Sequence, residues 1–323
     1  MSAAFFQTAF DPLQRLFWKT QINILRACPP LSGLVFRYGF GSSNSRRVWI
    51  KTFLQVTIHV PGAVLSHWRN KRKSRTVLSY VTMFITTRCT LRCDKCAAHI
   101  ADLPRHEDTP LQDLVHDMQS LLAGVNYIYE FMLCGGEPFL HADLDKILLA
   151  CAGSDQIGSI SVVTNGTAMP GEMLLGALKK ASATVRISKY NRALQPQVEH
   201  LKRLFKENGI RFTHNVTSWS DMGGFGQRQT GCEKRRFRVC TQQLNWSIYK
   251  GTFHLCGKSA FLTGGGVLTD NAQDYIDLRT MDPAQFGKGV DALLKRPVLS
   301  ACSHCLGNTY QTQKILSAVQ RES

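Results

Sequence analysis

No run of apolar residues in this 323-residue sequence reaches the roughly 18 to 20 residues that a membrane-spanning helix needs. The first residues, MSAAFFQTAFDPLQRLFWK, also lack the basic start, continuous apolar centre and small-residue cleavage site of a secretory signal. We therefore expect a cytoplasmic protein. Its composition, 44% hydrophobic and 19% charged residues, is that of an ordinary globular chain rather than a disordered one.

Acidic residues are almost missing from the first 75 positions, which hold 12 Lys and Arg but a single acid, Asp11. Most of the net charge of +16 therefore belongs to a basic N-terminal extension, which we place at residues 1–76. In residues 6–24, apolar side chains recur at helical spacing beside basic ones. This pattern fits a helix packed on its own domain or, less commonly, a helix lying on a membrane surface.

Two further stretches of the extension have weaker patterns. Residues 54–60 alternate like a strand before Pro61-Gly62. The basic run 69–75 has no interleaved aromatic residues, so it favours a solvated linker over a contact with nucleic acid. Peripheral contact of the extension with an anionic membrane stays open, and nucleic-acid binding is not favoured.

A disulfide framework is also not expected. The sequence has eleven cysteines, an odd number, and no export signal, so the thiols are expected in a reducing compartment. Metal or iron–sulfur ligation explains clustered thiols better. Three of them, Cys89, Cys93 and Cys96, lie within eight residues.

From residue 77 onward, short strand patterns alternate with helix patterns. Such alternation predicts parallel βα units in an open or closed barrel, with the chemistry at the carboxyl ends of the strands. The stretches that end the first four predicted strands carry thiols, glycines and small polar groups. The predicted strands are residues 77–86, 127–133, 160–164, 184–188 and 210–217, and the predicted helices are residues 111–124, 142–153, 171–181 and 195–209.

The three-cysteine loop after the first strand has an incomplete ligand set. Thiolate selects zinc, Cu(I) or iron–sulfur clusters. A closed structural zinc site needs four protein ligands, and His99 would have to be the fourth. The spacing differs from the paired CxxC knuckles that are usual for zinc. A four-iron cluster with three cysteine ligands instead leaves one iron open to another ligand.

The combination of motifs resembles the radical SAM superfamily. CxxxCxxC follows the first strand, GGEP (residues 135–138) the second and TNGT (residues 164–167) the third, and the resemblance covers about residues 80–220. It implies an α/β fold, a partial (β/α)6 TIM-like barrel. It also implies a [4Fe–4S] cluster whose open iron binds S-adenosylmethionine, which is cleaved to a 5′-deoxyadenosyl radical.

The same resemblance implies the contacts of S-adenosylmethionine. Gly135, Gly136 and Glu137 are expected to bind the methionyl amino group, since glycine permits close approach of the backbone and a carboxylate accepts from an ammonium. Asn165 and Ser188 are expected at the methionyl carboxylate and the ribose. Lys95 departs from the pattern, because the family often has an aromatic residue just before the third cysteine.

A second set of thiols, Cys240, Cys256, Cys302 and Cys305, resembles the Twitch extension of radical SAM enzymes, the shorter relative of SPASM. There a hairpin and a helix hold one auxiliary [4Fe–4S] cluster, and WSIYKGTFHLC predicts a hairpin that turns at Lys250-Gly251. Unrelated cysteines or a zinc site are the alternatives. We place the radical SAM core at residues 77–228 and the Twitch-like part at residues 229–323. Cys134 and Cys151 are interpreted as packing residues.

The number and placement of the thiols suggest two possible reactions of the substrate radical. A fully ligated auxiliary cluster accepts an electron, which favours oxidation of the substrate. Cys232, which has polar and basic neighbours, would instead return a hydrogen atom, giving epimerisation; an alternative cluster ligand or no role are its other interpretations. Asp221 is the candidate base. His214, Asn215 and Trp219 are further substrate-facing candidates.

The substrate is expected to be a small molecule or glycan, because the pattern as far as CSHCLGNTYQTQKILSAVQ resembles Twitch proteins of bacterial carbohydrate pathways. An external donor such as flavodoxin or ferredoxin is expected to supply the electron. Modification of a ribosomally made peptide is the second hypothesis. A zinc-stabilised nucleic-acid-binding protein is the third, and it predicts salt-dependent affinity.

Overall fold

The computed structural model describes residues 76–190, 195–216, 219–226, 231–309 and 312–321. The predictions for residues 6–24, 54–60 and 69–75 lie outside the described part. Within it, none of the helices has the length and apolar character needed to cross a bilayer.

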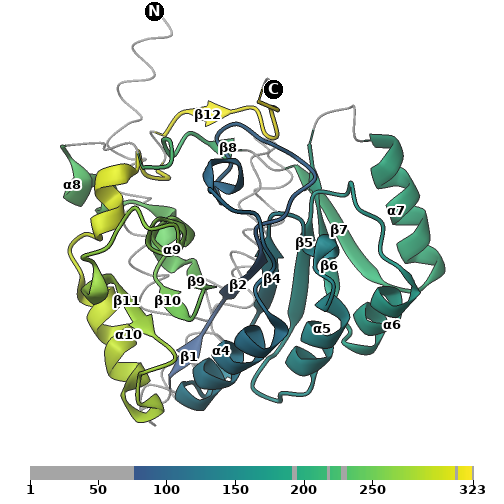
Figure 1. Cartoon of the computed structure of the whole chain (residues 1–323), viewed down its shortest axis with the longest axis horizontal. Coiled ribbons are helices and arrows are strands. Elements are labelled where there is room, and N and C mark those ends of the chain that lie inside the picture. Colours follow the sequence, from purple (N-terminus) through teal and green to yellow (C-terminus); the bar gives the residue numbers. More distant parts are fainter. Residues whose placement is uncertain (1–75, 191–194, 217–218, 227–230, 310–311, 322–323) are drawn as a thin grey trace, which may run out of the picture.

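Five parallel strands form the centre of the molecule, in the order β2 (Val81–Thr86), β4 (Phe131–Gly135), β5 (Ile160–Thr164), β6 (Thr184–Lys189) and β7 (Arg211–Val216). The helices that connect them cover the outer, convex face of the curved sheet (Figure 1). This arrangement confirms the predicted α/β fold. The connecting helices are α4 (Leu111–Gly124), α5 (Leu144–Ala152), α6 (Glu172–Lys180) and α7 (Gln195–Glu207).

The first two predicted strands are each interrupted. Short pieces at their starts, β1 (Val77–Leu78) and β3 (Tyr127–Ile128), pair with one another in a separate two-stranded sheet. Tyr129 N–H donates to the carbonyl of Leu78, and Val81 N–H donates to the carbonyl of Glu130. The chain thus steps from one sheet to the next without losing its backbone hydrogen bonds.

The C-terminal part continues the same sheet. Strand β9 (Trp246–Tyr249) pairs in parallel with β2 at the edge opposite β4, and β10 (Thr252–His254) and β11 (Tyr275–Asp277) follow in antiparallel order. The predicted hairpin turn is confirmed, with φ of 49° at Lys250 and 80° at Gly251. The sixth parallel strand of the sheet is therefore β9, so the sheet runs across the boundary that we placed at residues 228 and 229.

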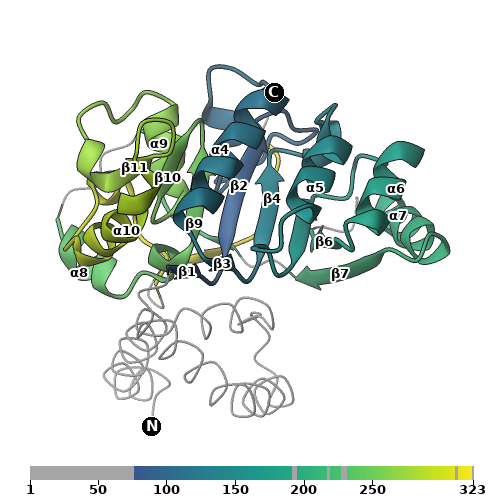
Figure 2. The same ribbon diagram turned by 90° about the horizontal axis from the view of Figure 1, so that it is seen from below.

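The remaining elements are the helices α8 (Glu233–Arg238), α9 (Gly257–Gly264) and α10 (Phe286–Lys295), the short strands β8 (Trp219–Ser220) and β12 (Lys314–Ile315), and the 3-10 turns η1 (Ile100–Asp102), η2 (Pro138–Leu140), η4 (Thr241–Leu244), η5 (Ala272–Asp274), η6 (Pro283–Gln285) and η7 (Ser300–His304). Helix α9 lies on the inner side of the curved sheet, whereas α10 lies on the outer side, beside β11 (Figures 1 and 2).

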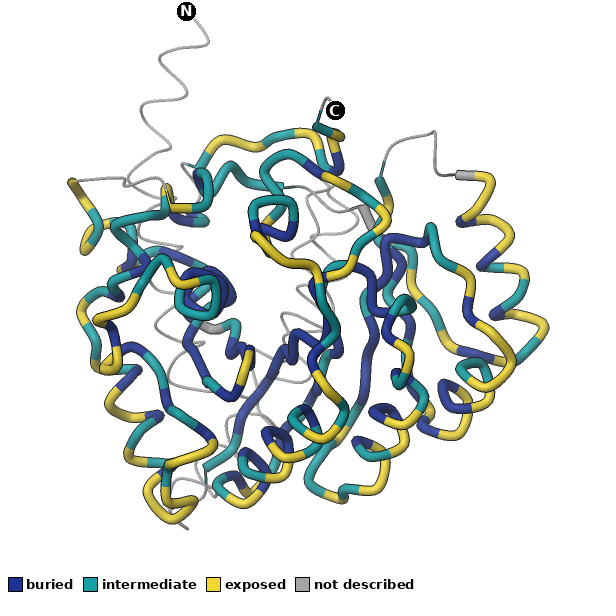
Figure 3. Tube along the Cα trace, viewed as in Figure 1, coloured by how far each residue is buried: buried dark blue, intermediate teal, exposed yellow. Residues whose placement is uncertain are grey.

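Strands β2, β5 and β9 are buried at almost every residue, as Figure 3 shows for the centre of the sheet. In β2, Met83 and Ile85 belong to the main core with the outer helices, whereas Thr82 and Phe84 line a cavity on the opposite, concave face. This follows from the two-residue period of a strand. Side chains for chemistry are therefore expected at alternate positions that face the concave side.

Candidate active site

The segments with predicted site residues follow the carboxyl ends of neighbouring strands. The three-cysteine loop follows β2, GGEP begins at the last residue of β4, TNGT begins at the last residue of β5, and Ser188 lies near the end of β6. Because these strands are adjacent and parallel, the four segments meet at one edge of the sheet. The expected gathering of motifs at one edge is confirmed.

The two glycines of GGEP pack against the backbone of the cysteine loop. A Cβ atom on Gly135 would lie 2.2 Å from the carbonyl oxygen of Thr86, and one on Gly136 would lie 2.2 Å from that of Arg88. Gly136 N–H donates to Thr86 O at 2.9 Å, and Glu137 N–H donates to Arg88 O at 2.8 Å. In this structure, glycine is thus required at both positions because two backbones are in contact. We had expected glycine to be required there so that a ligand could approach.

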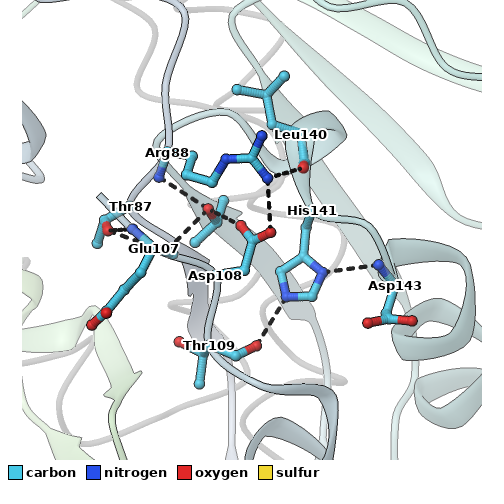
Figure 4. A network of polar contacts seen from close by, with 9 residues as sticks. Thr87, Arg88, Glu107, Asp108, Thr109, Leu140, His141 and Asp143 are labelled. Carbon is cyan, nitrogen blue, oxygen red and sulfur yellow. Dashed lines mark hydrogen bonds and ion pairs between the residues drawn. The ribbon is translucent and has the colours of Figure 1, made fainter. Parts of the chain in front are cut away.

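A polar network fixes the start of the cysteine loop (Figure 4). Arg88 donates to Asp108 Oδ2 at 3.0 Å. The buried imidazole of His141 lies between Thr109 O, 3.0 Å from Nε2, and Asp143 N, 3.1 Å from Nδ1. Asp143 N–H can only donate, so Nδ1 accepts and Nε2 carries the proton. The network joins the cysteine loop to the start of α4 and to the segment after GGEP.

Glu137 joins the ends of β4 and β5. Its side chain is fully buried, and Oε1 accepts from Phe139 N at 3.1 Å and Thr164 Oγ1 at 2.8 Å, while Oε2 accepts from Asn165 N at 2.8 Å. Burial raises the pKa of Glu137 to about 7. Protein donors thus use three of the roughly four acceptor positions of a carboxylate. One acceptor position on Oε2 has no donor among the described residues, but the side chain is fully buried, so its contact with an ammonium stays a prediction.

Nitrogen donors face the sulfur atoms of the loop. Cys89 Sγ accepts from Leu91 N at 3.4 Å and from Asn165 Nδ2 at 3.7 Å. Cys93 Sγ accepts from Gln320 Nε2 at 3.3 Å. N–H donors at thiolate sulfur are typical of iron–sulfur sites, where they tune the cluster. This set of sulfur acceptors and nitrogen donors fits the three-cysteine cluster that the sequence predicts.

The four cysteines of the second set line one cavity of about 210 Å³ on the concave face of the sheet. Cys134 of β4, which we had interpreted as a packing residue, also lines it. Ala97 and Ala98, which follow Cys96 directly, lie in the same wall. The cavity therefore adjoins both cysteine sets. The four cysteines are Cys240, Cys256, Cys302 and Cys305.

Nitrogen donors are found in the second set too. Asn308 N–H donates to Cys240 Sγ at 3.5 Å, and Gly307 N–H donates to Cys305 Sγ at 3.2 Å. The four thiols thus combine soft donors with backbone amides directed at sulfur, as an iron–sulfur site needs. The second set also fits the predicted group.

Burial raises the pKa of Cys89 and Cys240 to about 11 and that of Cys302 to about 12, and neighbouring thiols contribute to each of these shifts. These three thiols are therefore protonated when no metal is bound. Only thiolate binds metal, so assembly of a cluster must displace these protons.

Lys258 supplies a buried cation in the wall of the cavity. It lies two residues after Cys256, its side chain is 5% exposed, and Nζ donates to the carbonyls of Met222, Gly223 and Gly224 at 3.2–3.3 Å. Four thiolates around iron leave a net negative charge, which a buried ammonium stabilises. Lys258 was not predicted from the sequence, because a single Lys in an apolar helix has no distinguishing pattern.

Asp221 lies beside the cysteine loop. Asp221 Oδ2 is 3.5 Å from Lys95 Nζ, and Oδ1 accepts from Gly223 N at 2.9 Å. The residue that replaces the expected aromatic therefore pairs with the candidate base. The ring of Trp219 packs edge-on against Tyr190, which follows β6, with 5.8 Å between the ring centroids. Tyr190 was not predicted from the sequence.

Other candidates are less central. Cys232 is exposed, caps α8 and does not line the described cavity. His214 shares a face of β7 with Phe212, whose ring packs on Phe205 of α7. His214 therefore lies on the helix-covered face and not on the concave side, so its predicted role facing substrate is not supported. Of Asn215, only the backbone in β7 is described.

His99, the residue needed for the zinc alternative, is buried, and one of its two ring nitrogens has a hydrogen-bond partner. Its Nδ1 lies 3.1 Å from Asp102 Oδ2, and its ring centroid lies 5.6 Å from that of Phe225. Among the described residues, no three His, Cys, Asp or Glu side chains stand at the spacing of a single-ion site. His99 is thus a buried histidine with a hydrogen-bond partner at Nδ1, whereas Nε2 has none among the described residues.

The parallel sheet with outer helices, and the cysteine loop at its rim, define a radical SAM core. Residues 83–241 match the family model described as Radical SAM superfamily, and the chain belongs to this superfamily. Membership implies an enzyme that uses S-adenosylmethionine and a [4Fe–4S] cluster.

Curated relatives match only part of the chain. They include the GTP 3′,8-cyclase of Pelotomaculum thermopropionicum, 28% identical over 106 residues, which are 32% of this chain and 31% of that protein. The enzyme of the same name from Listeria monocytogenes is 32% identical over 116 residues, 35% of this chain and 34% of that protein. The match therefore spans about a third of the length of these relatives.

Solved structures resemble this chain weakly. BtrN in complex with AdoMet and 2-DOIA has 12% identity and a TM-score of 0.40, covering 71% of this chain and 92% of BtrN. SuiB of Streptococcus suis, bound to the precursor peptide SuiA, has 12% identity and a TM-score of 0.36, covering 78% and 81%. These likenesses are too low to assign a substrate or a site residue.

Proposed function

We propose that the protein is a two-cluster radical SAM enzyme that oxidises an alcohol carbon of a small hydroxylated, carbohydrate-type substrate. The observation that carries the proposal is the cavity lined by Cys240, Cys256, Cys302 and Cys305, whose wall continues into the loop of Cys96. In this proposal, Cys89, Cys93 and Cys96 hold the cluster that binds S-adenosylmethionine, and the other four hold an auxiliary cluster.

The bound groups would supply a 5′-deoxyadenosyl radical to take a hydrogen atom and an auxiliary cluster to take an electron. The chain supplies the base. Asp221, whose side chain is 20% exposed, lies at the cysteine loop through its ion pair with Lys95 and would accept the hydroxyl proton. Loss of one hydrogen atom, one proton and one electron turns the alcohol into a ketone. An external reductant of the flavodoxin or ferredoxin class would start each turnover.

Oxidation is favoured over epimerisation because the four cysteines of the cavity can close an auxiliary cluster that accepts an electron. Cys232, the hydrogen donor that epimerisation would need, is exposed. The contacts of Gly135, Gly136, Glu137, Asn165 and Ser188 with S-adenosylmethionine remain part of the proposal. Ser188 is suited to it, because Ile187 next to it is buried against the helices and Ser188 faces the opposite side.

GTP is the second candidate substrate, because the curated relatives carry the name GTP 3′,8-cyclase. Modification of a peptide is the third. All three reactions would consume S-adenosylmethionine, so production of 5′-deoxyadenosine does not separate them. Product analysis does: the proposal predicts a ketone from a polyol or aminocyclitol and no cyclised nucleotide from GTP.

The test of the two clusters is anaerobic reconstitution of the full chain, followed by counting of iron and sulfide. About eight irons per chain are expected, because each four-iron cluster adds four. Triple Cys→Ala variants of Cys89, Cys93 and Cys96, or of Cys240, Cys256 and Cys302, should each keep about four. The Cys232→Ala variant is the matched control and should keep eight. About four irons in the wild type would refute the auxiliary cluster, and stoichiometric zinc would refute both.

A further inference from the structure

The C-terminal segment lies along the three-cysteine loop. Strand β12 pairs with β8, and the chain then continues to the loop after β2, as the yellow trace in Figure 1 shows. There it forms a short antiparallel contact: Asp94 N–H donates to Val319 O at 2.7 Å, and Arg321 N–H donates to Arg92 O at 2.9 Å. Gln320 is thus placed directly opposite Cys93.

The side-chain amide of Gln320 has a fixed orientation. Oε1 accepts from Arg92 N at 2.8 Å, and Nε2 donates to Cys93 Sγ at 3.3 Å and to Ala318 O at 2.9 Å. The backbone N–H of Arg92 can only donate, and the carbonyl of Ala318 can only accept. A flipped amide would lose both bonds, so it is the NH₂ group that faces the sulfur.

Arg321 holds the other side of the loop. Its guanidinium donates to Asp102 Oδ1 at 2.6 Å and to Ala101 O at 3.1 Å. The second oxygen of Asp102 lies 3.1 Å from His99 Nδ1. Gln320 and Arg321 therefore contact the loop before and after Cys96, and they bind it through side chains as well as backbone.

We propose that residues 318–321 complete the site of the catalytic cluster, with Gln320 as a positioning residue that donates an N–H to the thiolate of Cys93. The proposal rests on the proposed function, in which Cys93 binds iron. Asn165 donates to Cys89 in the same way at 3.7 Å, so carboxamides from two distant parts of the chain serve two of the three thiolates. Such bonds stabilise the reduced cluster and raise its reduction potential.

The test uses the reconstituted full chain and two variants. Gln320→Glu keeps the shape but places an oxygen against Cys93 Sγ, and Gln320→Met removes the donor without adding charge. Both should shift the midpoint potential of the S-adenosylmethionine-responsive cluster to more negative values, the Glu variant by more, as followed by EPR during a redox titration. Gln313→Glu, which adds the same charge at an exposed position of the same segment, should keep the wild-type midpoint.

The outcomes distinguish a failure of the role given to Gln320 from a failure of the proposed function. A loss of about four irons in the Gln320 variants, with eight retained in Gln313→Glu, also supports the proposal. Wild-type midpoints in both Gln320 variants, with a cluster signal that still responds to S-adenosylmethionine, overturn the role of Gln320 alone. A wild-type signal that ignores S-adenosylmethionine, with no 5′-deoxyadenosine formed, overturns the proposed function and this inference together.

Discussion

At the scale of single residues, the backbone of the cysteine loop depends on the absence of a side chain in GGEP. Gly136→Ala would put a Cβ atom 2.2 Å from Arg88 O and 2.9 Å from Cys89 Cβ. We expect it to destabilise the metal-free protein by about 1–3 kcal/mol, because the backbones must separate. Urea unfolding measures this.

The matched control for this substitution is Gly176→Ala, in α6, where an added Cβ meets nothing within 4 Å. There we expect about 0.5–1 kcal/mol of stabilisation, because alanine favours the helix. Equal effects of the two substitutions on the free energy of unfolding would show that the close contact at Gly136 does not affect stability.

The base proposed for the reaction can be tested separately from radical formation. Asp221→Asn keeps an oxygen to accept from Gly223 N–H but cannot take a proton. Ketone formation should fall by about 100-fold or more, within the usual range for a general base, while 5′-deoxyadenosine is still produced. Liquid chromatography of both products gives the ratio. Asp155→Asn is the control, since this exposed residue precedes β5 at the opposite edge of the sheet. An unchanged ratio in Asp221→Asn would remove this residue from the mechanism.

Lys258 is expected to set the potential of the auxiliary cluster. Reduction adds a negative charge, which a nearby buried ammonium stabilises. Lys258→Met should therefore shift the midpoint to more negative values. The measurement is an EPR-monitored titration of the variant in which Cys89, Cys93 and Cys96 are replaced, so that only one cluster contributes.

The comparison for Lys258 is Lys250→Met. Lys250 is a half-exposed cation in the hairpin turn, where solvent and Glu107 screen its charge. The Lys250→Met substitution should leave the midpoint potential of the auxiliary cluster unchanged. If both substitutions shift the potential equally, the burial of Lys258 has no special role.

Single residues were predictable where chemistry demands a fixed spacing. The seven proposed ligand cysteines follow from short motifs, and the structure brings four of them to one cavity. Lys95 could not be explained from the sequence, because its partner Asp221 is more than a hundred residues away. Gln320 and Lys258 had no local signal at all, since each acts through contacts made only after folding.

At the scale of elements, an ion pair links the C-terminal strands to the outer helix layer. Arg279, after β11, donates to both oxygens of Asp117 in α4 at 2.8 and 3.2 Å, and Asp117 is 1% exposed. Arg279→Ala would leave a buried carboxylate without its main donor. We expect a loss of about 1–3 kcal/mol, reduced from the value for a fully buried pair because Arg279 is 39% exposed.

Thermal unfolding of the metal-free protein checks this loss. Lys146→Ala removes an exposed ion pair between α5 and Asp143, the residue just before it, and should leave the transition unchanged. A transition in Arg279→Ala as high as that of Lys146→Ala would show that the link between β11 and α4 adds nothing. Arg279→Lys should recover only part of the stability, since an ammonium cannot bind both oxygens in the same way.

The alternation of strands and helices was predictable because apolar periodicity is local. The pairing of β9 with β2 was not predictable, because the paired residues Val81 and Trp246 are 165 positions apart and parallel pairing leaves no local signature. Only the hairpin itself was visible, through Lys250-Gly251 and the alternating residues around it. This is why the sequence suggested a separate C-terminal unit where the structure has one continuous sheet.

At the scale of the whole molecule, the C-terminal part is a structural component of the core. Trp246, Phe253 and Phe286 belong to the same apolar cluster as Met83 and Phe131 of the central strands. The cavity of the second cysteine set has one wall from β2 and β4 and another from α8, α9 and η7. The cavity of the second cysteine set is therefore enclosed only when both the N-terminal strands and the C-terminal helices are present.

A chain that ends at residue 228 should consequently fail to fold as an independent radical SAM core. It would leave the edge of β2 unpaired and expose the apolar residues that β9, β10 and α10 cover in the full chain, and exposed edges of this kind aggregate. We expect the fragment to elute as aggregates in size-exclusion chromatography, to bind a hydrophobic dye and to hold no S-adenosylmethionine-responsive cluster. A monomeric fragment that unfolds cooperatively and binds four irons would contradict this expectation, because the first five parallel strands would then form a stable core without β9. The comparison must be made with the full chain under the same anaerobic conditions, since cluster binding itself stabilises the folded state.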